Sequence, residues 1–398
     1  MSTSLSAPNR LASIDVLRAL TMVLMIFVND LWSLTDIPQW LGHVERGVDG
    51  MGLADTIFPA FLFIVGMSLP FAIENRLKRG DFRGQVFRHV LVRTIALLIM
   101  GVFLVNGESI YAAAMPIPRW LWNPLCCLAF ICIWNHYSPN APTALVYGLR
   151  GLGIVALFAL AFVYRGGTPG ALSYFSPKWW GILGLIGWSY LASALIVIAA
   201  RNDPRMLLGG WLIFVTLSLV SSAGLLPQII HIVLPEPIAG GTLPALTMSG
   251  VLTTLTLRYY KKSEKPIRMA QVFAAAIGGL VVLTVMTRPL WGISKLAATP
   301  AWLFICSAIT LTAFLGIYWL VDVNTKGRWF DIIKPAGTDT LLCYLMPYLV
   351  YACFRLVDFQ FPTVLLVGGV GLVKSVALAF VCVWLTHALN RLGVRLRL

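Results

Sequence analysis

Long apolar segments separated by short polar connections dominate the chain. Twelve segments are long enough for a membrane-spanning helix, which needs about 20 mostly apolar residues, and unbroken apolar runs such as 272–283 and 364–373 lie inside them. A transmembrane barrel would show short stretches of alternating polarity instead. The pattern predicts an all-α polytopic membrane protein. The predicted spans are 17–34, 52–74, 89–106, 119–135, 142–164, 179–200, 206–226, 243–260, 270–288, 300–321, 338–355 and 362–388.

The composition agrees with a membrane protein, and the distribution of Lys and Arg among the loops predicts its orientation in the membrane. Of 398 residues, 59% are hydrophobic and 12% are charged, against about 25% charged in soluble domains. The net charge of +14 would suggest nucleic acid in a soluble protein, but here the cations follow the loops. Of 30 Lys and Arg, 22 fall in one alternating set of loops and seven in the other, with Lys374 inside the last span. By the positive-inside rule, both termini face the cytoplasm, and no nucleic-acid partner is expected.

Any chemistry must occur in or at the membrane, because no connection is long enough to fold alone. Residues 1–398 are therefore interpreted as a single integral-membrane domain surrounded by lipid. The most polar outside loop is 35–51, and the outside segment 227–244 is rich in Pro and Gly. The latter is either a plain connection or a re-entrant lid.

Ionisable residues within spans are costly, so each is a candidate for function. Asp15 and Arg18 are three residues apart at the cytoplasmic entrance of the first helix, a spacing that allows a side-chain pair. Such a pair either fixes the helix at the membrane interface or leaves Arg18 facing a cavity, where its guanidinium suits a phosphate.

A second group of candidates follows the outer end of the first span. Asn29 can orient a carbonyl or an amine, and His43, one of five histidines, lies in the outside loop. Asp49 and Asp55 follow within twelve residues of His43, and either carboxylate could orient the imidazole for acid–base chemistry. The alternative for Asp55 is that it complements the positive end of the second helix.

Generic motifs are missing from the sequence. It contains no Walker, dinucleotide-binding, GxSxG or HExxH pattern, each of which would point to a defined chemistry. The seven cysteines lie in or beside apolar spans without metal-ligand spacing, so no metal site is expected.

Three stretches resemble the heparan-alpha-glucosaminide N-acetyltransferase family of transmembrane acyltransferases. The first 75 residues are the most specific, through RLASIDVLRALTMVLMIFVND, the His43 loop and DGMGLADTIFPAFLFIVGMSLPFAI. Later stretches, RPLWGISKLAATPAW (288–302) and YWLVDV (318–323), are similar to that family's late helices. The resemblance therefore covers both ends of the chain, with a catalytic region at about 10–75.

The resemblance implies an enzyme that takes an acetyl group from cytosolic acetyl-CoA and delivers it to an amino sugar or a cell-envelope glycan across the membrane. Residue by residue, it assigns the family's loop histidine to His43, its helix-end asparagine to Asn29 and its aspartate before Phe-Pro to Asp55. Where the family has Trp-Asn-Gly, this chain has Val-Asp-Gly at 48–50, so a different acceptor pocket is expected. His43 would serve as general base or as a transient acyl carrier, and the sequence leaves both open.

The donor implied by the resemblance carries phosphates, so a basic cytoplasmic mouth is expected. Its candidates lie near the inner ends of the first two spans: Asp15, Arg18, Arg76, Lys78, Arg79 and Arg83. A bacterial inner membrane with a periplasmic His43 loop is the expected location, and a second copy of the chain is a further candidate partner. A secondary transporter remains the alternative, since twelve spans with both termini inside is also a transporter layout.

Overall fold

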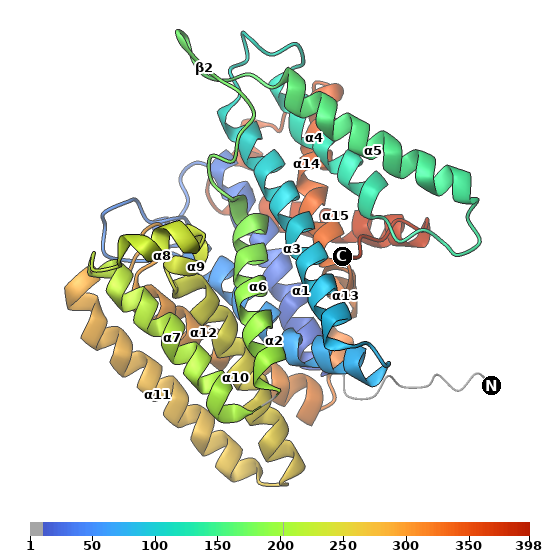
Figure 1. The fold of residues 1–398 in the computed structure, drawn as a ribbon. Helices are drawn as coiled ribbons and strands as arrows, with labels where there is room; N and C mark the ends of the chain where they lie inside the picture. Colours follow the sequence, from blue (N-terminus) through green and yellow to red (C-terminus); the bar gives the residue numbers. More distant parts are fainter. Residues whose placement is uncertain (1–10, 202) are drawn as a thin grey trace. The chain divides into compact units, whose positions relative to one another are not determined.

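The computed structural model describes residues 11–201 and 203–398, and it is almost entirely α-helical (Figure 1). Arg10, which begins the resembling stretch, lies outside the described residues. Nine helical segments of the described chain are long and apolar enough to cross a membrane. The prediction of an all-α polytopic membrane protein is therefore confirmed.

Helices occupy each of the twelve predicted segments. The longer helices are α1 (Ala12–Asp30), α2 (Ala54–Lys78), α3 (Arg83–Asn106), α4 (Arg119–Trp134), α5 (Thr143–Val163), α6 (Gly181–Ala200), α7 (Pro204–Ser222), α10 (Thr242–Lys262), α11 (Pro266–Trp291), α12 (Pro300–Tyr318), α14 (Thr340–Leu356) and α15 (Gly368–Arg391). Short elements are α8 (Gln228–Val233), α9 (Glu236–Ala239), α13 (Lys334–Thr338) and the strands β1 (Gly166–Thr168) and β2 (Ala171–Ser173).

Three of the twelve predicted spans are not among those nine candidates. The helices α4 and α14 have 16 and 17 residues, which at a rise of 1.5 Å per residue gives about 24 and 26 Å, short of a hydrocarbon core of about 30 Å. The helix α10 has 21 residues, but five of its buried residues are Thr or Ser. The sequence pattern found helices correctly and did not separate long apolar ones from short or hydroxyl-rich ones.

The described chain divides into two compact units, and four of the dividing points fall inside α1, α3, α6 and α13. Unit 1 contains the described residues 11–21, 40–91, 188–201 and 203–334, and unit 2 contains residues 22–39, 92–187 and 335–398. Whether residues 1–398 act as a single domain stays a prediction.

Unit 1 is built around the close approach of α2 and α10. A Cβ atom at Gly66 would lie 1.7 Å from the Thr247 carbonyl oxygen, and one at Gly250 would lie 1.9 Å from the Phe63 carbonyl oxygen. The Thr254 hydroxyl donates to the Met67 carbonyl across the same seam. Small residues thus let the two backbones touch, as in other packed membrane helices. Around this seam pack α7, α11 and α12.

Unit 2 packs α4 against α5 and α14. The buried Trp122 indole donates to the Phe103 carbonyl at 2.9 Å, so α4 is tied to α3 by a satisfied polar contact. The strands β1 and β2 form an antiparallel hairpin, with Gly166 opposite Ser173. Three isolated bridges join segments within this unit: Ile110 with Gly166, Thr35 with Val367, and Asn135 with Leu396.

Candidate active site

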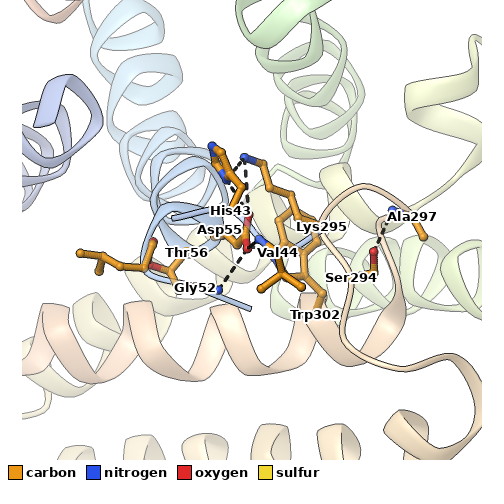
Figure 2. Close-up of polar contacts among 10 residues, drawn as sticks. His43, Val44, Gly52, Asp55, Thr56, Ser294, Lys295, Ala297 and Trp302 are labelled. Atoms are coloured by element: carbon orange, nitrogen blue, oxygen red, sulfur yellow. Dashed lines mark hydrogen bonds and ion pairs between the residues drawn. The ribbon is translucent and has the colours of Figure 1, made fainter. Parts of the chain in front are cut away.

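The site lies in unit 1, where the loop before α2 folds back onto the start of that helix. The Nδ1 atom of His43 lies 2.7 Å from Oδ1 of Asp55. Asp55 is in the first turn of α2, and its carboxylate is almost fully buried, with 3% of the side chain exposed. Figure 2 shows the imidazole and the carboxylate facing each other, with Lys295 beside them.

The other carboxylate oxygen of Asp55 is held by the loop itself. Oδ2 accepts hydrogen bonds from the backbone N–H groups of Val44 at 3.0 Å and Gly52 at 3.1 Å. The loop closes this tightly because residue 52 is glycine: a Cβ there would lie 2.0 Å from the Gly42 carbonyl oxygen. Asp55 therefore has a fixed orientation before any substrate arrives, which is a requirement for precise acid–base chemistry.

The proton on His43 follows from the partner it faces. An ionised carboxylate only accepts hydrogen bonds, so Nδ1 carries a proton, and in the neutral imidazole Nε2 then keeps its lone pair. The His43 side chain is 51% exposed, unlike its partner. The pair can therefore present an unprotonated nitrogen to a molecule in the loop region, as a general base or nucleophile must.

Between the two carboxylates that the sequence left open, Asp55 is the one beside His43. Asp49 bonds elsewhere: Oδ1 accepts from the backbone N–H of Ile293 at 2.7 Å, and Oδ2 pairs with Arg288 at 2.9 Å. The Ile293 N–H bond and then the Arg288 guanidinium lower the pKa of Asp49 below its ordinary value. Asp49 thus ties the His43 loop to the connection after α11.

Lys295, in that connection, is the site residue that sequence reasoning missed. Its Nζ lies 3.3 Å from Nδ1 of His43 and 3.8 Å from Oδ1 of Asp55. Burial lowers the pKa of Lys295, and the Asp55 charge opposes that effect. The only signal was its position in the stretch 288–302, because nothing in the sequence shows a contact 252 residues apart.

Trp302 also contacts the start of α2, at the backbone of Asp55. Its buried indole N–H donates to the Asp55 backbone carbonyl at 3.1 Å, and its side chain is among the largest fully buried ones. The connection between α11 and α12 is therefore bound to the start of α2 as well as to the loop before it.

Asn29, the remaining catalytic candidate, belongs to unit 2. It is exposed and lies one residue before the end of α1. Its catalytic role stays a prediction from the resemblance.

Four of the six residues expected at a donor mouth, Asp15, Arg18, Arg76 and Lys78, form ion pairs within unit 1. Arg18 pairs with Asp15 at 3.0 Å, as their spacing predicts, and also donates to Ser68. Arg76 pairs with Asp81 at 3.0 Å, and Lys78 pairs with Glu74 at 2.8 Å. Glu74 is also bonded by Arg258 of α10. Arg79 is exposed at the end of α2. Donor binding by these side chains stays a prediction.

Unit 2 holds a different polar cluster, centred on Asp30. Its carboxylate accepts hydrogen bonds from Tyr351, from Lys374 at 2.6 Å and from Ser375 at 2.5 Å. The Lys374 ammonium also donates to Ser33 at 2.9 Å. Only 1% of the Asp30 side chain and 6% of the Lys374 side chain are exposed. The cluster joins α1, α14 and α15, and it is closed to solvent.

A metal centre finds no support in the part of the chain that the structure describes. No group of three or more His, Cys, Asp or Glu side chains there could hold a metal ion. The chemistry available at His43 is that of an imidazole, a carboxylate and an ammonium group.

Together, the fold and the site define a polytopic membrane protein with a carboxylate-oriented histidine in the loop before its second helix. Residues 10–118 match the family described as heparan-alpha-glucosaminide N-acetyltransferase, catalytic, which confirms the resemblance over that region. His43 and Asp55 lie inside it, whereas Lys295 and Trp302 lie outside.

Two curated relatives each align to about a quarter of the chain. The heparan-alpha-glucosaminide N-acetyltransferase of Mus musculus is 33% identical over 104 residues, and that of Homo sapiens is 30% identical over 99 residues. These alignments cover 26% and 25% of this chain, and 15% and 14% of the relatives. The alignments thus show distant homology, and the matched part is about one seventh of each relative's length.

Proposed function

We propose that this protein is an integral-membrane acyltransferase that moves an acetyl group from cytosolic acetyl-CoA to an amino sugar or cell-envelope glycan on the other side of the membrane. The observation that carries the proposal is the pairing of His43 with a buried Asp55, inside the region homologous to an acetyltransferase catalytic domain. The Nε2 atom of His43 would accept the proton that the acceptor nitrogen loses as it attacks the thioester.

The membrane and orientation belong to the same proposal: a bacterial inner membrane, twelve spans, both termini cytoplasmic and the His43 loop periplasmic. Two loops that touch must lie on the same side of the membrane. The number of membrane-spanning helices between them along the chain must therefore be even. Ile110 bridges to Gly166, with only α4 and α5 between them. Because α5 is long and apolar enough to span, α4 should cross as well, despite its length.

The same requirement for an even number of crossings indicates that α10 and α14 also cross the membrane. Asp49 bonds Ile293, and with α4 counted, an even number of crossings between them requires α10. The Thr35 N–H bonds the Leu366 carbonyl, and an even number there requires α14.

Labelling from each side of the membrane tests this topology at α4. Single cysteines introduced at the exposed positions Ala113 and Asn140 should react with a membrane-impermeant maleimide from opposite sides. Reaction of both from the same side would remove the α4 crossing, and with it the twelve-span topology.

The activity is tested with the purified full-length chain in detergent. Saturable binding of acetyl-CoA, with release of free CoA when an amino sugar such as glucosamine is added, is the expected result. A panel of amino sugars then addresses the acceptor. Binding of neither acetyl-CoA nor CoA would contradict the proposal.

The two possible roles of His43 separate in the absence of acceptor. A transient acyl carrier would give acetyl-labelled protein on mixing with acetyl-CoA alone, and mass spectrometry would locate the label on His43. A general base would give no labelled histidine. The half-exposed side chain of His43 is compatible with both.

A secondary transporter of a small polar solute is the second candidate, and the Asp30–Lys374 pair is the observation that favours it. Ionisable pairs within spans often mark ion or substrate pathways in transporters. A transporter should move its solute without a thioester present, whereas an acyltransferase should require one.

A further inference from the structure

Lys295 has hydrogen-bonding capacity that its protein neighbours do not use. An ammonium group offers three N–H donors and no acceptor. Among residues 11–201 and 203–398, the only hydrogen-bond contact of Nζ is with Nδ1 of His43 at 3.3 Å. The Asp55 oxygen at 3.8 Å contributes charge attraction, since it lies beyond hydrogen-bond distance.

The contact with His43 cannot be a hydrogen bond while His43 is bound to Asp55. A neutral imidazole nitrogen either carries a proton or offers a lone pair. The 2.7 Å contact with Asp55 requires the proton on Nδ1, so Nδ1 has no lone pair left for Lys295. In the tautomer that leaves Nε2 free to act as a base, the ammonium group therefore has all three donors available.

Hydrogen bonds fix the backbone of the connection that carries Lys295, and the Lys295 side chain reaches from it to the imidazole. Gly50 donates to the Ile293 carbonyl at 3.0 Å, next to the Asp49 bond to the Ile293 N–H at 2.7 Å. The Thr299 hydroxyl accepts from the Ser294 N–H and donates to the Gly292 carbonyl. Only 24% of the Lys295 side chain is exposed, which strengthens its electrostatic effect on a bound group.

From this geometry we infer that Lys295 is a catalytic residue whose ammonium group binds the acyl carbonyl oxygen and stabilises the negative charge that develops on it. The inference rests on the proposed acyltransferase function. Fixed donors aimed at a developing oxyanion are among the largest contributors to acyl transfer.

The step balances without a further reactant. The acceptor nitrogen forms a bond to the thioester carbonyl carbon, the carbonyl π electrons move onto oxygen beside Lys295, and Nε2 of His43 takes a proton from that nitrogen. When the intermediate collapses, the carbon–sulfur bond breaks and the sulfur leaves with the proton held by His43. Amide and thiol are the products, and Lys295 keeps its proton throughout.

This role makes activity depend on a charged Lys295. Because burial lowers the pKa of Lys295 below the ordinary lysine value of 10.5, the ammonium group loses its proton at a lower pH than an exposed lysine does. Acetyl transfer should therefore decline on the alkaline side earlier than a solvent-exposed lysine would predict.

Substitution of Lys295 tests the inference in the full-length protein, with acetyl-CoA as donor and glucosamine as the acceptor probe. Lys295→Met should lower kcat by about 10²- to 10³-fold, the usual loss for an oxyanion donor, while the KM for acetyl-CoA changes by less than about threefold. Lys295→Arg, which keeps a cationic donor, should keep at least about ten times the kcat of the Met variant. The matched control is Lys326→Met, at an exposed lysine, which should behave as wild type.

The outcomes separate the two proposals. A Lys295→Met kcat within about threefold of wild type would overturn the role of Lys295 and leave the acyltransferase standing. If wild type and Lys326→Met alike bind neither acetyl-CoA nor CoA and release no CoA with any amino sugar of the panel, the acyltransferase proposal is overturned, and the Lys295 inference with it. If Lys295→Met does not fold, a Lys295→Gln variant decides: equal kcat for Gln and Arg would contradict a need for positive charge.

Discussion

Two aspartates in this protein are equally buried and equally hydrogen-bonded, but the side chains that they bind differ in exposure. Asp30 in unit 2 and Asp55 in unit 1 each accept three hydrogen bonds. The partner of Asp30 is Lys374, with 6% of its side chain exposed, whereas the partner of Asp55 is His43, with 51% exposed. A buried, saturated carboxylate is thus not in itself a sign of catalysis. The half-exposed side chain of its partner His43 is what makes the Asp55 site suited to chemistry.

The largest loss of stability should come from removing Asp30, at the centre of the buried polar cluster in unit 2. Asp30→Ala leaves the Lys374 ammonium buried without its counter-ion, which typically costs about 3–5 kcal/mol. The double variant Asp30→Asn with Lys374→Met removes both charges, so it should be more stable than Asp30→Ala. Thermal unfolding in detergent measures both, and an unchanged melting temperature for Asp30→Ala would contradict a structural role for the pair.

At the open site, Asp55→Asn should act on the reaction more than on the fold. With its oxygen held by the Val44 and Gly52 N–H groups, the new amide would turn its NH₂ toward His43. Nδ1 would then accept, Nε2 would carry the proton, and the base would be lost. We expect kcat for acetyl transfer to fall by about 10²-fold or more. A kcat within about threefold of wild type would show that Asp55 does not set the histidine tautomer.

Trp302→Phe removes one bond beneath the open site. Loss of the indole donor leaves the Asp55 carbonyl unpaired, which should cost about 1–2 kcal/mol of unfolding free energy and reduce kcat by only a few fold. The matched control is Trp329→Phe, since Trp329 is exposed. Equal melting temperatures for the two variants would argue against the contact with Asp55.

The smallest effect is expected at Asp49, and it should depend on pH. The pKa of Asp49 is lowered in the folded protein, so its stabilising contribution is present above the ordinary pKa of 3.8 and disappears as the pH falls through the lowered value. Asp49→Asn should therefore lower the melting temperature at neutral pH and converge with wild type in acid. Asp36→Asn is the control, because Asp36 is exposed and its positive φ suits asparagine. Parallel melting curves for Asp49→Asn and wild type at every pH would exclude this contribution.

The sequence predicted the helices well, because an apolar run of span length has few alternatives in a membrane. It also predicted the Asp15–Arg18 pair, which depends only on helical spacing. It did not separate the nine long apolar helices from α4 and α14, which are short, or from α10. The buried face of α10 is rich in hydroxyl groups that bond within the helix and to α2.

Contacts between distant segments explain what the sequence could not predict. From the sequence, either Asp49 or Asp55 could pair with His43. The structure shows that the pair is His43 with Asp55, because the loop closes at Gly52 and brings its own N–H groups and His43 to that carboxylate. Lys374 lies 344 residues from Asp30, and no pattern along the chain connects them. The same holds for Lys295 beside His43.

The most direct test of the central claim compares His43→Ala with His231→Ala in acetyl transfer from acetyl-CoA to glucosamine, using purified full-length protein. His231 is exposed and lies in α8, so its removal serves as the matched control. The proposal predicts that His43→Ala loses at least about 10²-fold in kcat while it binds acetyl-CoA and melts as wild type does, and that His231→Ala keeps its activity. Wild-type turnover by His43→Ala would contradict the assignment of this site as the catalytic centre.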